Sequence, residues 1–181
     1  MKRIVGSGST FLLLKAGSDN PEFVEIDNPG SGFEKFNELV GAECGEIVLS
    51  RELSQIARDN GIGGCIELWI DDEGAIKVDD SGVPVKKVNK VASIFVGQLI
   101  FGDALVILTD PTTGESYGFD RPTFTWLDRV IRALRSPLRE QIVAAMMSQM
   151  VAQWDEWMRL TKGTGVQIIE VPAEDAKGGA A

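Results

Sequence analysis

Histidine is absent from this chain of 181 residues. Histidine is the commonest general base at neutral pH and a usual zinc ligand, so its absence excludes Ser-His-Asp, Cys-His and His-metal chemistries. A carboxylate-based hydrolase stays open, but no pair of Asp or Glu side chains stands out for acid–base work. We therefore predict no catalytic residue, no metal site and no cofactor, and we expect a protein that is not an enzyme.

Cysteine is also scarce, because Cys44 and Cys65 are the only two in the chain. Two cysteines are too few for a disulfide framework. Both lie in apolar surroundings next to expected strands. They are predicted to be small buried thiols and not a redox pair.

Long apolar runs are missing as well. No run approaches the roughly 20 residues that span a bilayer, and the early run at residues 11–14 is too short for the apolar region of a signal peptide. Residues 6–10, Gly-Ser-Gly-Ser-Thr, lack the lysine and the following helix of a phosphate loop and are predicted to be a hairpin turn. We expect a soluble, cytoplasmic protein without a membrane partner.

The charge is negative and uneven. The net charge is −9, with 20 acidic and 11 basic side chains in residues 1–121 and 7 of each in residues 122–181. An acidic chain is handicapped in neutralising phosphates, which argues against a nucleic-acid partner. The acidic part leaves open an inhibitor that mimics DNA, although its acid density is modest for that role.

Hydrophobic periodicity predicts an α+β fold, mainly an antiparallel sheet with short helices, followed by a C-terminal helical hairpin or helix pair. Helices are expected at residues 33–40, with Gly41 as the C-terminal cap, and at residues 51–59, with Ser50 as the N-cap. Two further helices are expected at residues 126–135 and from Pro137 to about residue 160. The expected strands are residues 3–5, 11–15, 23–26, 46–49, 65–70, 75–78, two segments within 94–108, and 117–119.

The predicted domain organisation has three parts: an acidic α+β core at residues 1–121, a helical extension at 122–165, and a short strand or arm with a flexible tail at 166–181. Within the core, residues 71–74 form a predicted turn whose partner strand returns at 75–78. The acidic clusters at 71–73 and 79–80 are interpreted as solvated turns and not as calcium sites. Asp103 is expected to accept backbone N–H bonds at a Gly-Asp corner.

Four arginines gather at the expected helix junction: Arg129, Arg132, Arg135 and Arg139. Spacing of three places the first three near one another on a helix. The cluster is a candidate anion-binding site for a small ligand or nucleotide. Docking against the acidic part, in the same chain or a second copy, is the open alternative.

The long second helix carries the candidate partner or self-association residues: Met146, Met147, Met150, Trp154, Trp157 and Met158. With neighbouring aliphatic residues they sweep about half of the circumference. About 25 helical residues extend roughly 37 Å, more than one small core covers. Met and Trp are large, adaptable contact residues. Packing on the chain's own domain and contact with a partner both stay open.

Five successive segments carry a family resemblance: residues 36–41, 45–48, 68–77, 83–89 and 101–107. Their order resembles an uncharacterised small-protein domain family of bacteriophages, plasmids and bacteria. The shared pattern is Leu-Val-Gly, a hydrophobic strand, an acidic turn ending in Gly, Pro-Val-Asn and Gly-Asp-Ala-Leu.

The resemblance covers roughly residues 33–115 and has two departures. The Pro-Val-Asn element is interrupted here by Lys86-Lys87-Val88, and residues 51–64 look like an insertion. The family has no established activity, so the resemblance implies a context, a mobile element in a bacterial cytoplasm. The leading hypothesis is a non-enzymatic accessory protein that binds a host protein or self-assembles, with counter-defence as one purpose. A nucleotide-binding module and an acidic DNA mimic are the alternatives.

Overall fold

A computed structural model describes residues 9–18, 20–27, 32–79, 84–120 and 137–164, with residues 123, 125, 127 and 129. In the last of these ranges, the side chains of 138–140, 154, 155, 157, 158 and 160–164 lie outside the description. The chain divides into two compact units, Met1–Met146 and Met147–Ala181, each described by itself. The three-part organisation stays a prediction, and its last part lies outside the described residues, as does the expected strand at 3–5.

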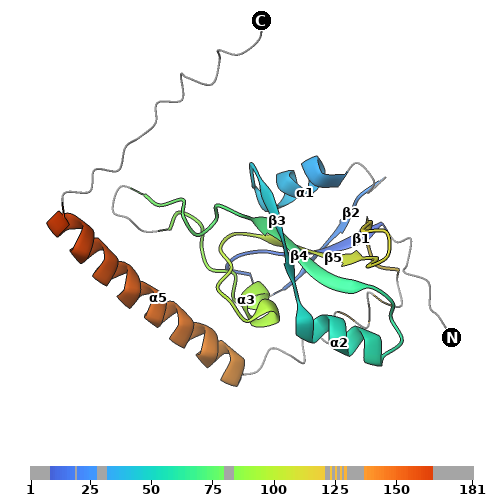
Figure 1. Cartoon of the computed structure of the whole chain (residues 1–181). Helices are drawn as coiled ribbons and strands as arrows, with labels where there is room; N and C mark the ends of the chain where they lie inside the picture. Colours follow the sequence, from blue (N-terminus) through green and yellow to red (C-terminus); the bar gives the residue numbers. More distant parts are fainter. Residues whose placement is uncertain are drawn as a thin grey trace, which may run out of the picture. The chain divides into compact units, whose positions relative to one another are not determined.

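The first unit is built on one antiparallel sheet, in the order β2-β1-β5-β4-β3 with β6 paired to β5 (Figure 1). Near-continuous apolar runs form its central strands, as expected of a sheet with two packed faces. The strands are β1 (Thr10–Leu14), β2 (Glu22–Glu25), β3 (Gly45–Leu49), β4 (Cys65–Asp71), β5 (Ala104–Thr109) and β6 (Ser116–Tyr117). Together with the helices, this sheet confirms the predicted α+β fold.

Four helices are described at full length: α1 (Gly32–Val40), α2 (Arg51–Asp59), α3 (Lys90–Val96) and α5 (Pro137–Thr164). The bounds of α2 were predicted to the residue, because Ser50 caps it by accepting the Leu53 N–H. Residues 123, 125, 127 and 129 are also helical, which covers the start of the helix expected at 126–135. No helix in the described part of the chain is long and apolar enough to cross a membrane.

The two faces of the sheet carry separate hydrophobic clusters, with α1 on one side and α2 and α3 on the other (Figure 1). Register places Leu13, Leu105 and Trp69 in one row across three strands, on the α1 side with Phe36. The opposite row faces α2 and α3 and is the larger cluster. Each face is therefore closed by helices that are themselves amphipathic.

Asn89 ties three parts of the first unit together. Its Oδ1 accepts the Ala92 N–H at 3.0 Å, which caps α3, and its amide donates to Leu14 O at 2.7 Å and Gly102 O at 3.1 Å. The side chain is buried, with 1% exposed. Nearby, Asp103 accepts the Ala16 N–H at 2.8 Å, which confirms the corner predicted for it.

Three predictions about strands and thiols are wrong. Residues 75–78 do not return as a partner strand, because both sides of β4 are already taken by β3 and β5. Residues 94–96, expected in a strand, belong to α3, which ends at Gly97 with a left-handed φ of 71°. Cys44 is exposed and Cys65 only half-buried, so they are not the buried thiols that their apolar neighbours suggested.

Candidate protein-interaction surface

The outer edge of β3 displays backbone groups that point away from the rest of the sheet. Ser50 N–H donates to Ile66 O at 3.1 Å and Asp72 N–H to Cys44 O at 3.3 Å, so the even-numbered residues of this segment point their backbone groups at β4. Backbone direction alternates along an antiparallel strand. The N–H and C=O groups of Gly45, Ile47 and Leu49 therefore point away from β4. Among the described residues no strand pairs with that side.

The same residues present apolar side chains. Ile47 lies opposite Trp69 in the register, which puts Ile47 and Leu49 on the α1 face of the sheet. They are 42% and 43% exposed, and Phe33 in the first turn of α1 is 61% exposed. We call Phe33, Ile47 and Leu49, together with Trp69 of β4, the β3 edge patch.

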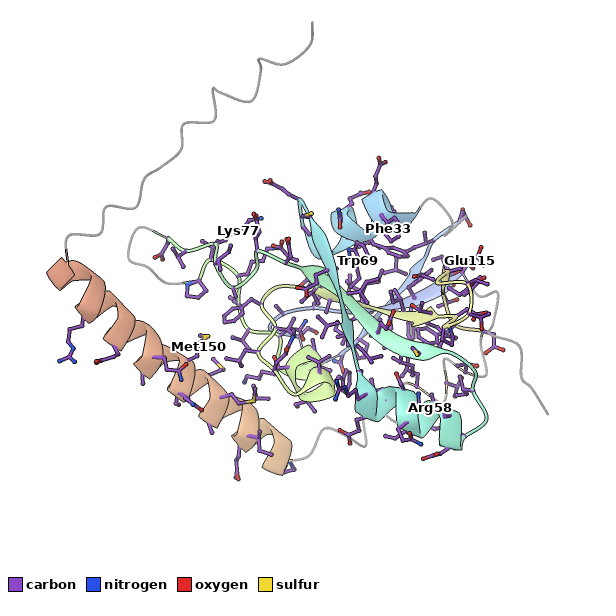
Figure 2. The ribbon with its side chains drawn as sticks, in the orientation of Figure 1. Phe33, Arg58, Trp69, Lys77, Glu115 and Met150 are labelled. Atoms are coloured by element: carbon purple, nitrogen blue, oxygen red, sulfur yellow. The ribbon has the colours of Figure 1, made fainter. Side chains whose placement is uncertain are left out.

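Trp69 is the fixed part of the β3 edge patch. Its ring stacks on Phe33 at 5.1 Å between centroids and meets the edge of Phe36 at 5.7 Å. Its Nε1–H donates to Asn37 Oδ1 at 2.9 Å. Figure 2 shows Phe33 and Trp69 next to each other on the α1 side. The indole is thus held by three residues of α1, which gives the patch a rigid floor.

Glycine at position 45 is what lets the indole lie across β3. A Cβ at this position would come within 2.1 Å of Trp69 Nε1 and 2.4 Å of Asn37 Oδ1. Any larger residue must displace the indole or its hydrogen-bond partner. The space above Gly45 is therefore filled by a side chain from the neighbouring strand, and the outer edge at this point is bare backbone.

The opposite edge of the sheet is protected by charge. β2 is four residues long and has Glu22 and Glu25 at its ends. Glu22 pairs with Lys15 at 3.0 Å. Glu25 accepts hydrogen bonds from Thr10 and Ser9, which lower the pKa of its carboxyl group below the ordinary value. Short, charged edge strands resist pairing with other chains. The β3 edge, with one Glu and two exposed aliphatic residues, lacks that protection.

Beside the patch, a buried ion pair fixes the end of α1 to the end of β4. The Asp71 side chain is fully buried, and Lys86 Nζ lies 2.5 Å from its Oδ2. The same ammonium donates to Gly41 O at 2.7 Å and Val40 O at 3.3 Å, where a cation complements the helix C-terminus. The interpretation of residue 71 as part of a solvated turn is wrong.

Lys77 completes this ion cluster from the rim. Its Nζ lies 3.0 Å from Glu73 and 3.7 Å from Asp71. The Glu73 carboxylate, with a smaller contribution from Asp71, raises the pKa of Lys77 above its ordinary 10.5. The cluster is structural in character, since its cations face carboxylates and carbonyl groups of the same chain.

The predicted site residues fall partly outside this description. Arg129 is described and exposed, whereas Arg132 and Arg135 and the side chain of Arg139 lie outside the described residues. On α5, Met146, Met147 and Met150 are each half-buried and Val143 is buried. The side chains of Trp154, Trp157 and Met158 lie outside the described part. The arginine cluster and the Met/Trp face therefore both stay predictions.

A second group of exposed apolar residues follows β4. Ile76, Val78 and Val85 are 68%, 38% and 65% exposed, and Val85 N–H donates to Lys77 O at 2.8 Å. Residues 80–83, at the centre of this segment, lie outside the described residues. The β3 edge patch is the better-defined surface because it combines exposed side chains with open backbone groups.

No group of His, Cys, Asp or Glu residues in the described ranges is arranged to hold a metal ion. Comparison with protein-family models, with curated proteins and with solved structures finds no match. The resemblance to the phage and plasmid family accordingly stays a prediction. The function has to be argued from the surface itself.

The β3 edge patch was not among the sequence-based candidates. The strand at residues 46–49 was expected, but its place at the outside of the sheet depends on pairings with residues far along the chain. The available signals were Gly45, the alternation of Ile47 and Leu49, and the lack of Lys or Pro in the strand. Only the topology turns those signals into a surface.

Proposed function

We propose that this protein acts by binding another protein, as a non-enzymatic accessory protein of a phage or plasmid in the bacterial cytoplasm. The observation that carries the proposal is the β3 edge, where open backbone groups adjoin exposed Ile47 and Leu49. A strand added to such an edge gains main-chain hydrogen bonds, and side-chain pockets supply specificity. The exposed apolar side chains beside this edge support the proposal, since contiguous exposed apolar surface is typical of interaction sites.

The partner is either a host protein or a second copy of the chain. The phage and plasmid context, which rests on the family resemblance, favours a host component and includes a defence protein among the targets. The Met/Trp face of α5 is a second proposed contact, and Val151 is its exposed described neighbour, with 53% of its surface exposed. Catalysis has no part in this proposal.

Site-specific photo-crosslinking in bacterial cells tests the proposed function. A photoreactive residue is placed at Leu49, at Val151 or, as the matched control, at Thr112, which is exposed in the turn after β5. We expect light-dependent adducts from Leu49 and Val151 that Thr112 does not give. An adduct at twice the chain's mass identifies a second copy, and any other mass identifies a host protein. Adducts no stronger than the Thr112 background at both positions would refute the proposed function.

A further inference from the structure

We propose that the β3 edge pairs with β3 of a second copy, antiparallel and about a two-fold axis, so that the two sheets join into one. This pairing names the partner that the proposed function leaves open. It rests on the proposed function only because both treat the β3 edge as a binding surface. It does not involve α5. The choice of a second copy follows from register, charge and shape, taken in turn below.

Backbone direction restricts the register. Hydrogen-bonded pairs across the edge can join only residues whose backbone groups point outward, namely Gly45, Ile47 and Leu49. With Ile47 opposite Ile47 of the second copy, Gly45 lies opposite Leu49 at both ends. All five residues of the strand are then paired.

Charge argues against one neighbouring register, and the other, which pairs Ile47 with Leu49, leaves Gly45 and Glu46 without a partner in the strand. Centred on Ile47, the pairing puts Glu46 opposite Val48 of the second copy, whereas a shift that pairs Gly45 with Ile47 would put Glu46 opposite Glu46. Beyond the strand ends, the Ile47-centred register brings Glu43 towards Arg51 of the second copy. Both residues are exposed and opposite in sign, and the two-fold axis forms the contact twice.

The shape of the α1 face supports pairing with a second copy in the Ile47-centred register. Leu49 of the second copy would lie beside Gly45, next to the Trp69 indole that fills the space above this glycine. Ile47 would meet its own counterpart, and Phe33 would border the contact. The strand is short and the interface lies below the roughly 1,200 Å² of standard complexes, so we expect a dissociation constant on the order of tens of micromolar.

Sedimentation equilibrium of the full chain tests the proposal through a charge swap. We expect the unaltered chain to dimerise reversibly, and Glu43→Arg and Arg51→Glu each to weaken the dimer by about 3- to 10-fold. The double variant should restore it. Because the whole of β3, roughly 13 Å from its first to its last Cα, lies between the two residues, we do not expect the swap to rebuild a contact within one chain. On the β2 edge, Phe23→Lys should leave dimerisation unchanged.

Disulfide trapping tests the two-fold axis separately. Ile47→Cys in a Cys44→Ser background should form a disulfide-linked dimer when oxidised by copper phenanthroline and oxygen. Directly opposed hydrogen-bonded residues have Cα atoms about 5.5 Å apart, within the reach of a disulfide. Glu46→Cys in the same background is the control, since its counterpart is Val48, and we expect it to crosslink at least about 10-fold more slowly.

Three results would overturn the proposal: a chain that stays monomeric at hundreds of micromolar, a double charge swap that restores nothing, or equal crosslinking from positions 46 and 47. If Leu49 crosslinks only to a host protein, this inference fails while the proposed function stands. If neither Leu49 nor Val151 crosslinks, the proposed function fails first.

Discussion

Replacing Asn89 by alanine is expected to lower the free energy of unfolding by about 3 kcal/mol or more. The substitution removes an N-cap, worth roughly 0.5–2 kcal/mol. It also leaves the carbonyl groups of Leu14 and Gly102 without their buried donor, at about 1–3 kcal/mol for each unsatisfied group. These contacts join the end of β1, the start of α3 and the approach to β5, so the loss falls on the whole first unit.

Urea denaturation measures this loss of stability. The slope of the unfolding free energy against urea concentration should be the same for the variant and the parent chain. Asn60→Ala is the matched control, because Asn60 also donates from its amide to a carbonyl, Ile56 O at 2.8 Å, but is exposed. We expect the control to cost less than about 1 kcal/mol. Asn89→Asp keeps the cap acceptor and sets a carboxylate against two carbonyl oxygens, so it should recover no stability. Equal losses for Asn89→Ala and Asn60→Ala would contradict the role assigned to Asn89.

Replacing Lys86 by methionine is expected to cost about 3 kcal/mol. Methionine keeps an apolar stem but leaves the buried Asp71 carboxylate with Lys77 at 3.7 Å as its nearest cation. Removing one partner of a buried ion pair typically costs 3–5 kcal/mol, and Lys77 places this case at the lower end. The C-terminal carbonyl groups of α1 lose their donor in the same step.

A double-mutant cycle with Asp71→Asn separates the pair from other effects. We expect the double variant to be more stable than the sum of the two single losses implies, by about 1–3 kcal/mol. Lys87→Met, at the exposed neighbouring position, should stay within about 0.5 kcal/mol of the parent chain. Strict additivity in the cycle would show that Asp71 and Lys86 do not act as a pair.

Local signals were enough to predict much of the fold. The helix at Arg51–Asp59 combines a serine cap, an apolar face and an Asn-Gly stop, and all of these are read within a dozen residues. The strand at Cys65–Asp71 follows from alternation, and the strands at Thr10–Leu14 and Gly45–Leu49 follow from short apolar runs. Elements whose cause lies within their own residues are the ones that sequence reasoning recovers.

The failures have non-local causes. Residues 75–78 look like the second strand of a hairpin, but β4 satisfies its backbone with β3 and β5 instead. Residues 94–96 lie in an apolar run that suits a strand, yet they form the last turn of a helix that begins at Lys90, after the Asn89 cap. For Asp71, burial depends on a lysine fifteen positions along the chain.

The candidate surface was harder to predict than the fold. The residues of β3 do not indicate that this strand is the outermost one, because its position depends on the order of all the other strands. The role of Gly45 is equally hidden, since the indole that needs its space comes from β4. The Met/Trp face of α5, in contrast, was chosen from periodicity alone and stays a prediction.

Amide hydrogen exchange of β3, followed residue by residue by NMR, tests most directly the claim that this edge is open and receives a partner strand. In dilute solution we expect the N–H groups of Ile47 and Leu49 to exchange rapidly, while Val48 and Ser50, bonded to β4, are protected. At concentrations well above the dissociation constant, Ile47 and Leu49 should slow several-fold and Ser50 should change little. Rapid exchange of Ile47 and Leu49 at every concentration, or protection of both even when dilute, would contradict it.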